Sequence, residues 1–370
     1  MFAGDLKVVS KKVMAVWQYL NFIAVLLRAH LIEEYKQVAA MNRSKKHHLP
    51  SGGFRNNEAM QMHHRSLRNI LKWKITETLP ETVSIPVVDD DYSVFEHSDK
   101  SLTSWIGHAT FLIRHQGMNI ITDPHFSERA SPVQWAGPKR YSPPAIAIDA
   151  LPHVDVVVIS HDHYDHLDRN SVLAIQNRQK DNPPLFMLPL GLGQWFSKQA
   201  IDNWVELDWW ESHTHRGWTY TAVPCQHFSG RSIFPDRTLW CGWVFEATAE
   251  SSEPGKRFYF AGDTGYSSDF KAIGEHFGYM DMAMLPIGAY EPRWFMKEIH
   301  VNPAEAVHIH NDVGSRLSLA MHWGSFMLTN EPMLQPPEDL QVAKRQQGVA
   351  DNDFIVIKPG KIMALFDDGL

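Results

Sequence analysis

The chain has 370 residues, and its 44% hydrophobic and 21% charged residues are typical of a globular protein with one large domain or two ordinary ones. Its net charge of −7 is uneven, because residues 1–75 carry +9 and residues 76–370 carry −16, which favours contact of the basic part with an anionic surface. The only two cysteines, Cys225 and Cys241, exclude a disulfide framework and a C-x-x-C metal site.

An apolar segment over residues 13–27 follows Lys7, Lys11 and Lys12 and precedes Arg28. As a helix it would be about 22 Å long, whereas the hydrocarbon core of a bilayer is about 30 Å thick. We therefore predict a helix that lies on, or partly in, an anionic membrane surface at the cytoplasmic face, and no contact with nucleic acid. Three alternatives stay open: a signal peptide for export, a membrane anchor, and a core or dimer helix that would join two copies in a homodimer.

The composition of the sequence changes twice between this segment and the main domain. Residues 42–58 are basic and interrupted by glycine and proline, which is typical of a linker. Residues 58–74 favour a helix, and Leu79-Pro80 ends the region. We therefore predict a basic N-terminal extension over residues 1–80 and a main domain over residues 81–370.

Residues 104–113 and 118–122 resemble two strands with a Gln-Gly turn between them, which predicts a β-hairpin that ends at Asp123. His108 and Asp123 lie near strand ends, where either could support a metal ligand through a hydrogen bond. For His108 we favour a buried, hydrogen-bonded histidine. For Asp123, support of a loop and the capping of a turn both stay open. Residues 125–144 then form a long loop, and long ordered loops usually carry function.

Residues 154–159 form a short run of mostly branched apolar side chains, which is typical of a strand buried on both faces. Directly after it, His161, His163, Asp165 and His166 form the pattern H-x-H-x-D-H. In a tight loop this spacing can aim the first two imidazoles at one metal ion and the next two side chains at a second. Histidine and carboxylate ligands at this density suit Zn²⁺ or a similar metal. We therefore predict a metal site here rather than a solvated turn.

Three later strands each end at a residue that could complete the metal site. His227 follows a short strand, Asp263 ends the apolar strand over residues 258–263, and His322 follows the strand over residues 317–321. No internal repeat, Walker loop, G-x-S-x-G or kinase signature is present. The other predicted elements are helices over residues 171–180 and 191–200, a helix that begins at Asn302-Pro303, strands over residues 185–190 and 282–286, and a closing hairpin over residues 354–370.

Taken together, these motifs resemble the metallo-β-lactamase superfamily, and in detail the branch that contains N-acyl-phosphatidylethanolamine-hydrolysing phospholipase D and its bacterial relatives. The resemblance implies an α/β fold, the αβ/βα sandwich, in which two mixed β-sheets pack face to face with helices outside. Residues 81–370 would then be a metallo-β-lactamase-like hydrolase domain. The resemblance is carried by residues 53–57, 105–110, 122–124, 128–132, 137–140, 159–168 and 300–306.

The resemblance also implies a cofactor of two Zn²⁺ ions, although other divalent metals would suit the same ligands. The implied ligands are His161, His163 and His227 for one ion, Asp165, His166 and His322 for the other, and Asp263 as the bridge. The implied catalytic residues are Asp165, Asp263 and His300, and the implied contacts to the phosphate or head group are Gln134, Tyr164 and His300. Arg169 departs from the pattern, because an aromatic residue is expected there in the mammalian enzyme.

These residues imply a phospholipase D-type hydrolysis of N-acylphosphatidylethanolamine-like lipids to N-acylethanolamine and phosphatidic acid, by attack of a metal-bridging hydroxide on phosphorus. Trp294, Phe295 and Met296 could line a groove for the acyl chain. His300 could donate a hydrogen bond to a phosphoryl oxygen or serve the structure alone. Two alternatives stay open: a metal-dependent lactonase of the same fold that acts on a small polar substrate, and a non-enzymatic metal-binding or membrane scaffold protein.

Overall fold

The computed structural model describes residues 45–60, 66–76, 80–231, 236–248 and 255–366. Contacts divide the chain into two compact units, residues 1–52 and residues 53–370, whereas the sequence favoured a boundary at residue 80. The apolar helix predicted over residues 13–27 lies outside the described residues. All the described helices and strands belong to the second unit.

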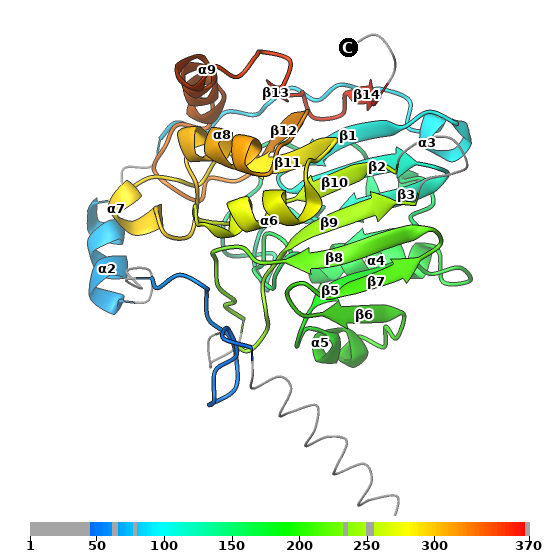
Figure 1. The fold of residues 1–370 in the computed structure, drawn as a ribbon, viewed down its shortest axis with the longest axis horizontal. Helices are drawn as coiled ribbons and strands as arrows, with labels where there is room; N and C mark the ends of the chain where they lie inside the picture. Colours follow the sequence, from blue (N-terminus) through cyan, green and yellow to red (C-terminus); the bar gives the residue numbers. More distant parts are fainter. Residues whose placement is uncertain (1–44, 61–65, 77–79, 232–235, 249–254, 367–370) are drawn as a thin grey trace, which may run out of the picture. The chain divides into compact units, whose positions relative to one another are not determined.

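Within the described residues, fourteen strands form two sheets of seven strands each (Figure 1). The first sheet has the order β14-β1-β2-β3-β4-β5-β6. Its strands are β1 (Leu102–Gly107), β2 (Thr110–His115), β3 (Met118–Thr122), β4 (Val156–Val158), β5 (Leu185–Pro189), β6 (Trp204–Leu207) and β14 (Ile362–Ala364). The second sheet has the order β13-β12-β11-β10-β9-β8-β7. Its strands are β7 (Ser212–His215), β8 (Trp218–Val223), β9 (Gly242–Ala247), β10 (Arg257–Phe260), β11 (Met282–Pro286), β12 (Ser318–Met321) and β13 (Phe354–Ile355).

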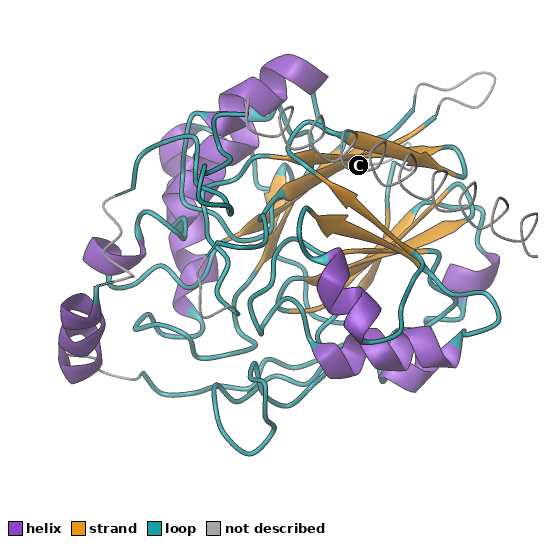
Figure 2. Ribbon diagram, turned by 90° about the horizontal axis from the view of Figure 1, so that it is seen from below, coloured by secondary structure: helices purple, strands orange, loops and turns teal. Residues whose placement is uncertain are grey.

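Both sheets are mixed. In the first sheet the pairs from β14 to β3 are antiparallel and the pairs from β3 to β6 are parallel. In the second sheet the pairs from β7 to β10 are antiparallel and the pairs from β10 to β13 are parallel. Figure 2 shows helices on either side of the strands. The predicted sandwich of two mixed sheets with helices outside is therefore confirmed.

The helices lie around the two sheets (Figure 1). They are α2 (Leu67–Thr76), α3 (Val94–His97), the 3-10 helix η2 (Ile148–Ala150), α4 (Arg169–Arg178), α5 (Gly193–Lys198), α6 (Asp269–Phe277), α7 (Arg293–Met296), α8 (Pro303–Asp312) and α9 (Gln335–Gln347). The start of α8 is as predicted: the Asn302 side chain accepts a hydrogen bond from the Glu305 backbone, the Glu305 carboxylate accepts from the Asn302 backbone, and Pro303 follows the cap.

Strand β4 carries the chain through the middle of the first sheet. Val156 and Val158 are fully buried in the core between the two sheets. Val157, which points to the opposite face, packs in a second core with Val172 and Ile175 of α4. The branched apolar run is therefore buried on both faces, as predicted, and it holds the start of the following loop rigidly.

Two predicted elements differ from the structure. The strand predicted over residues 104–113 is two strands, β1 and β2, because Gly107 and His108 have φ values of 137° and 53° and turn the chain between them. The closing hairpin predicted over residues 354–370 is wrong, because β13 pairs with β12 in the second sheet and β14 pairs with β1 in the first. Local alternation of side chains cannot show which sheet a strand joins.

The helix predicted over residues 58–74 corresponds to α2, which begins later, at Leu67. In the part of the chain that the structure describes, each helix is too short or too polar to cross a membrane.

Candidate metal centre

The predicted ligands lie where strands of both sheets end. The loop over residues 160–168, called the metal loop below, follows β4 in the first sheet. His227, Asp263 and His322 follow β8, β10 and β12 in the second sheet. The structure brings all the predicted ligands together in overlapping groups whose ligand atoms lie within 4.8 Å of one another. These groups are His161, His163, His227 and Asp263; His108, Asp165, His166 and His322; and Asp263, His300 and His322.

The first group is built around His163. Its Nδ1 lies 2.9 Å from His161 Nε2 and 3.1 Å from His227 Nε2. The Oδ2 atom of Asp263 lies 3.9 Å from the Nε2 atoms of both His161 and His227. Three imidazole nitrogens and one carboxylate thus face a common point, which is the donor set of many protein zinc sites.

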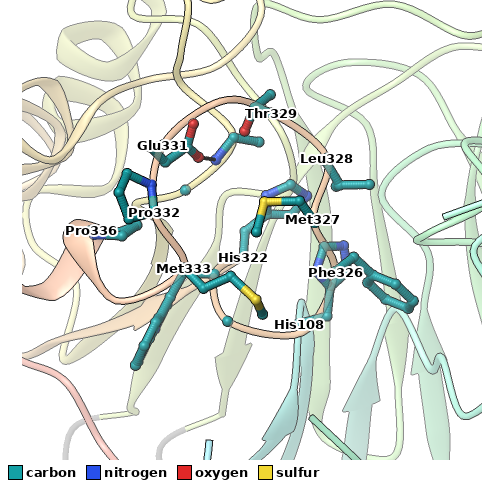
Figure 3. A pocket seen from close by; sticks show the side chains of 14 residues that line it. His108, His322, Phe326, Met327, Leu328, Thr329, Glu331, Pro332, Met333 and Pro336 are labelled. Atoms are coloured by element: carbon teal, nitrogen blue, oxygen red, sulfur yellow. Dashed lines mark hydrogen bonds between the residues drawn. The ribbon is translucent and has the colours of Figure 1, made fainter. Parts of the chain in front are cut away.

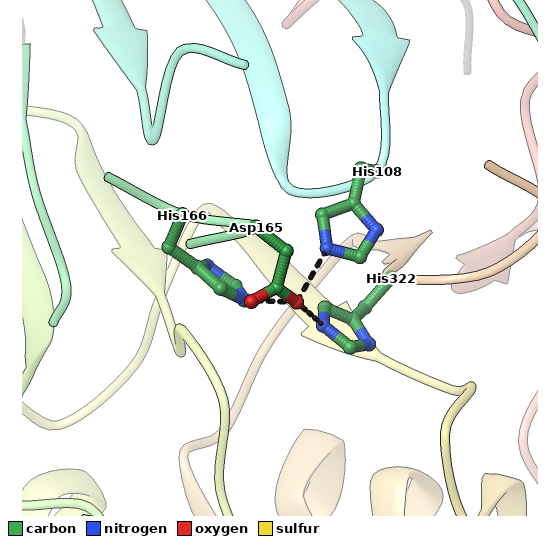
Figure 4. Close-up of side chains that lie close together, drawn as sticks. All are labelled: His108, Asp165, His166 and His322. Carbon is green, nitrogen blue, oxygen red and sulfur yellow. Dashed lines mark hydrogen bonds and ion pairs between the residues drawn. The ribbon is translucent and has the colours of Figure 1, made fainter. Parts of the chain in front are cut away.

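The second group is built around Asp165 (Figure 4). Its Oδ2 lies 3.4 Å from the Nε2 atoms of His166 and His322, and 3.0 Å from His108 Nε2. Asp263 faces this group too, because its Oδ2 lies 3.1 Å from His166 Nε2 and its Oδ1 lies 3.0 Å from His322 Nε2. The Asp263 carboxylate therefore stands between the two groups, as a bridging ligand would.

Unsatisfied atoms at the centre fit a metal. Among the described residues, His166 Nε2, His322 Nε2 and Asp263 Oδ1 are buried and, although His322 Nε2 lies 3.0 Å from Asp263 Oδ1 and His166 Nε2 lies 3.1 Å from Asp263 Oδ2, none of the three makes a hydrogen bond of regular geometry. Buried polar atoms in folded proteins nearly always have one. Imidazole nitrogens and carboxylate oxygens at this density suit a divalent cation of the zinc type.

The charges at the centre favour the same conclusion. Burial lowers the pKa values of His161 and His227 well below the ordinary value, so both imidazoles are neutral and have a free electron pair. Burial alone would also lower the pKa of His166 and His322, but the Asp263 carboxylate raises the pKa of His166 well above its ordinary value and that of His322 to about 9. The acidic side chains therefore attract positive charge, which a divalent cation also supplies.

Asp123 supports the metal loop through hydrogen bonds to two of its residues. Its Oδ2 accepts hydrogen bonds from His166 Nδ1 at 2.7 Å and from Ser160 Oγ at 2.5 Å, and its Oδ1 accepts from the Ser160 backbone N–H at 2.7 Å. Ser160 Oγ lies 2.8 Å from His161 Nδ1. One carboxylate thus orients a histidine of each group, which is the loop-supporting role that the sequence left open.

Two further residues contact the predicted ligands: Asn56, which was not predicted as part of the site, and His108, for which support of a metal ligand was one of the open readings. Asn56 lies in the predicted linker, yet its amide contacts the backbone of His227 on both sides. The one signal in the sequence was that residues 53–57 carry part of the family resemblance. His108 is buried, as expected, but its partner is the predicted ligand Asp165 rather than a group elsewhere.

An apolar cleft of about 320 Å³ opens beside the centre. Its apolar lining comes from α2, α7 and nearby loops, and its floor includes His163, Asp165, Asp263 and His300. His300 Nδ1 lies 3.9 Å from Asp263 Oδ2. The apolar residues include Ile70, Trp73, Phe228, Phe295, Met296 and Ile299.

A second hollow of about 330 Å³ holds the other predicted substrate residues. Tyr164 lines it, and its ring stacks 4.1 Å from the guanidinium of Arg231. Gln134 also lines it, but its amide exchanges hydrogen bonds of 3.1 and 3.2 Å with the backbone of Arg129. Arg169 lines the same hollow and donates to Gln199 Oε1 at 2.6 Å. The predicted substrate residues are thus divided between two neighbouring cavities.

A small cavity of about 20 Å³ lies against His108 and His322, under the segment that follows β12 (Figure 3). Glu331 holds this segment in place, because its carboxylate accepts hydrogen bonds from the backbone N–H groups of Ala289 at 2.6 Å and Glu291 at 3.0 Å. Glu331 therefore ties the segment after β12 to the loop after β11, and both Glu331 and His322 line the small cavity.

Comparisons with known proteins agree with this geometry. The family model described as "Beta-lactamase superfamily domain" matches residues 118–323. The N-acyl-phosphatidylethanolamine-hydrolyzing phospholipase D 1 of Caenorhabditis elegans is 39% identical over an alignment of 328 residues that covers 81% of this chain and 88% of the relative. The mitochondrial N-acyl-phosphatidylethanolamine-hydrolyzing phospholipase D of Saccharomyces cerevisiae is 33% identical over an alignment of 258 residues that covers 68% of this chain and 53% of the relative.

Solved structures share the fold. A metallo hydrolase from the archaeon Ignicoccus hospitalis superposes with a TM-score of 0.53 at 19% identity, over 73% of this chain and 100% of that one. At this level of identity the likeness concerns the fold alone.

Proposed function

The chain belongs to the beta-lactamase superfamily and, within it, to the family of the N-acyl-phosphatidylethanolamine-hydrolysing phospholipases D, and we propose that it is a dinuclear zinc phosphodiesterase of this type. The proposed reaction converts N-acylphosphatidylethanolamine-like lipids to N-acylethanolamine and phosphatidic acid. The observation that carries the proposal is the position of the Asp263 carboxylate between two groups of buried histidines.

In this proposal each of the two ions has its own set of ligands. His161, His163 and His227 would hold one zinc ion, Asp165, His166 and His322 the other, and Asp263 both. When bound, zinc makes water acidic enough to supply hydroxide near neutral pH and neutralises charge on phosphoryl oxygens. Metal ligands must be unprotonated: the lowered pKa values of His161 and His227 already meet this need, whereas at His166 and His322, whose pKa values are raised, a bound cation would take the place of the proton.

His300 acts on the substrate in this proposal. Burial lowers its pKa to about 4, so the imidazole is neutral near pH 7 and keeps one N–H. The ring lies in the floor of the apolar cleft beside Asp263, where that N–H can donate to a non-bridging phosphoryl oxygen. Such a bond strengthens as negative charge grows on the oxygen.

The two cavities match the two ends of a lipid substrate. The apolar cleft offers aromatic and aliphatic side chains to an acyl chain, and the hollow with Tyr164, Gln134 and Arg231 offers hydrogen-bond donors to a phosphate or head group. An apolar cleft of this kind favours a lipid over the small polar substrate of a lactonase.

A membrane surface is the proposed source of the lipid. Helix α2, whose Ile70 and Trp73 line the cleft, turns Leu71 and Ile75 outward with 61% and 74% of each exposed. Its sequence, LRNILKWKIT, contains three basic residues and no acidic one, which suits anionic lipid head groups. Contact through residues 13–27, a position at the cytoplasmic face and a homodimer stay predictions.

The test is hydrolysis of N-acylphosphatidylethanolamine in vesicles by the purified full-length protein, in water enriched in ¹⁸O. We expect N-acylethanolamine and ¹⁸O-labelled phosphatidic acid by mass spectrometry, loss of both products with a chelator, and recovery with added zinc. Hydrolysis of lactones but of no phosphodiester would favour the lactonase. Two bound metal ions with no hydrolysis of either substrate would favour the scaffold protein.

A further inference from the structure

Residues 53–58, which the sequence assigned to a linker, are tied into the fold of the second unit. The Phe54 backbone N–H donates to the Asp236 carbonyl at 2.9 Å, and the Glu58 carboxylate accepts from the Ser268 backbone N–H at 2.8 Å. The segment between these two contacts is therefore held at both ends, directly beside the strand that delivers His227.

Asn56 lies in the middle of this segment and contacts the backbone of His227. Its Nδ2 donates to the His227 carbonyl at 2.8 Å, and its Oδ1 accepts from the His227 N–H at 3.1 Å. The same Oδ1 accepts from Trp240 Nε1 at 2.9 Å, which fixes the plane of the amide. We propose that Asn56 is a positioning residue that sets the place of the His227 backbone, and thereby of one ligand of the first metal group.

The chemistry of the contact requires an amide. The backbone of one residue offers a donor and an acceptor, and among side chains only asparagine and glutamine present a matching acceptor and donor in one rigid plane. His227 has left the ladder of β8, so these backbone groups have no strand partner, and Asn56 replaces it. The ring is oriented separately, because His227 Nδ1 donates to the Ile299 carbonyl at 2.9 Å. Backbone and ring together determine where Nε2 points.

This inference rests on the proposed metal site, and metal affinity tests both. The experiment loads the purified full-length protein with metal, titrates it with a competing chelator, and counts metal equivalents that are lost at each step. It compares wild type with Asn56→Ala, Asn56→Asp and Asn57→Ala. The last variant is the matched control, because Asn57 is the next residue and its amide donates to Asp269 Oδ1 at 2.8 Å, away from the ligands. Loading with Co²⁺ adds an absorption spectrum that reports the geometry at each ion.

We expect Asn56→Ala to lower the affinity for one of the two metal equivalents by about 10- to 100-fold, which is the usual cost of losing a group that orients a metal ligand. The other equivalent should keep its affinity, and one part of the Co²⁺ spectrum should shift. Asn57→Ala should match wild type in both respects. Asn56→Asp keeps the shape and the acceptor but loses the donor to the His227 carbonyl, so it should show the same selective loss even where the alanine variant does not fold.

Two results would overturn the inference. One is a folded Asn56→Ala or Asn56→Asp variant with wild-type affinity for both equivalents and an unchanged Co²⁺ spectrum. The other is an equal loss in Asn56→Ala and Asn57→Ala, which would assign the effect to general destabilisation of the segment. A wild-type protein that binds no metal would instead refute the proposed metal site itself.

Discussion

The two sheets supply the metal centre in different ways. The first sheet delivers His161, His163, Asp165 and His166 in one stretch, directly after the buried strand β4. The second sheet delivers one residue after each of three strands that are far apart in the sequence. The difference shows that a short motif can define most of one half of a site, while the other half depends on the assembly of β8, β10 and β12, with β9 and β11 between them, into one sheet.

The supports of the two halves differ as well. In the metal loop, the single carboxylate of Asp123 orients His166 directly and His161 through Ser160. In the second sheet, His227 has its own partners, Ile299 and Asn56. Damage to the support of the first sheet should therefore reach both metal groups, and damage in the second sheet should stay with one ligand.

The largest effect is expected for Asp263→Ala, because Asp263 is the one residue of the second sheet that faces both groups. Both metal equivalents should bind more weakly, and kcat should fall by about 10²- to 10⁴-fold, as for other positioned catalytic groups. Metal content by mass spectrometry and vesicle hydrolysis measure this. The control is Asp312→Asn, whose carboxylate accepts from Tyr266 Oη at 2.5 Å and joins none of the metal groups. Full metal content in Asp263→Ala would contradict the bridging position.

The next effect is expected for Asp123→Asn. The amide keeps the shape of the side chain but presents a donor where His166 and Ser160 need an acceptor, so both metal equivalents should lose about 10- to 100-fold in affinity. Competition with a chelator measures the two losses separately. Loss of affinity for one equivalent alone would show that Asp123 supports only one of the two groups.

A smaller effect is expected in the cleft. Phe295 lines it, whereas Trp294, which the sequence also suggested for the acyl groove, is not among the lining residues and is 39% exposed. Phe295→Ala should therefore raise KM for a long-chain substrate by about tenfold, because the variant loses part of the apolar surface that the acyl chain would bury. The KM for a short-chain soluble diester should not change. Trp294→Ala is the control and should change neither. Equal effects of both variants on both substrates would refute the assignment of the cleft to the acyl chain.

The smallest effect concerns a histidine away from the centre. Burial, aided by Lys256, lowers the pKa of His115 on β2 from 6.5 to about 4. Between these values the unfolded chain binds a proton that the folded chain excludes, so this contribution to stability is complete above pH 6.5 and is lost as the pH falls toward 4. His115→Gln should flatten the pH dependence of the unfolding free energy in this window by up to about 3 kcal/mol. Urea unfolding at several pH values measures it, and parallel curves for both proteins would contradict it.

Several elements could be predicted because their signals are local. The branched apolar run of β4, the apolar strand β11 and the cap of α8 at Asn302 each contain their own signal within a few residues. Strand β7 was not predicted, because its side chains are polar and alternate between exposed and half-buried. The strands β13 and β14 were mistaken for a hairpin, because adjacency in sequence favours pairing and only packing assigned them to different sheets.

The residues of the site likewise differ in whether their signals are local in the sequence. The ligands of the metal loop follow from their spacing after a buried strand, and the family pattern then pointed to His227, Asp263 and His322. Asn56 was assigned to a linker, because the composition of residues 42–58 carries no trace of a hydrogen-bond partner 171 positions away. The contribution of Ile70 and Trp73 to the cleft was not predicted for a similar reason, because they follow a helical pattern that is equally typical of a core.

By itself, the sequence determined the kind of chemistry at the centre, because imidazole and carboxylate groups at the spacing of residues 161–166 have few uses other than holding metal. The tertiary structure decided which residues hold those ligands in place and which side chains line the approach to them. The physical reason is range: ligand spacing is set by neighbouring peptide bonds, whereas the contacts of Asn56, Asp123 and Phe295 join segments that are far apart in the sequence and exist only in the folded chain.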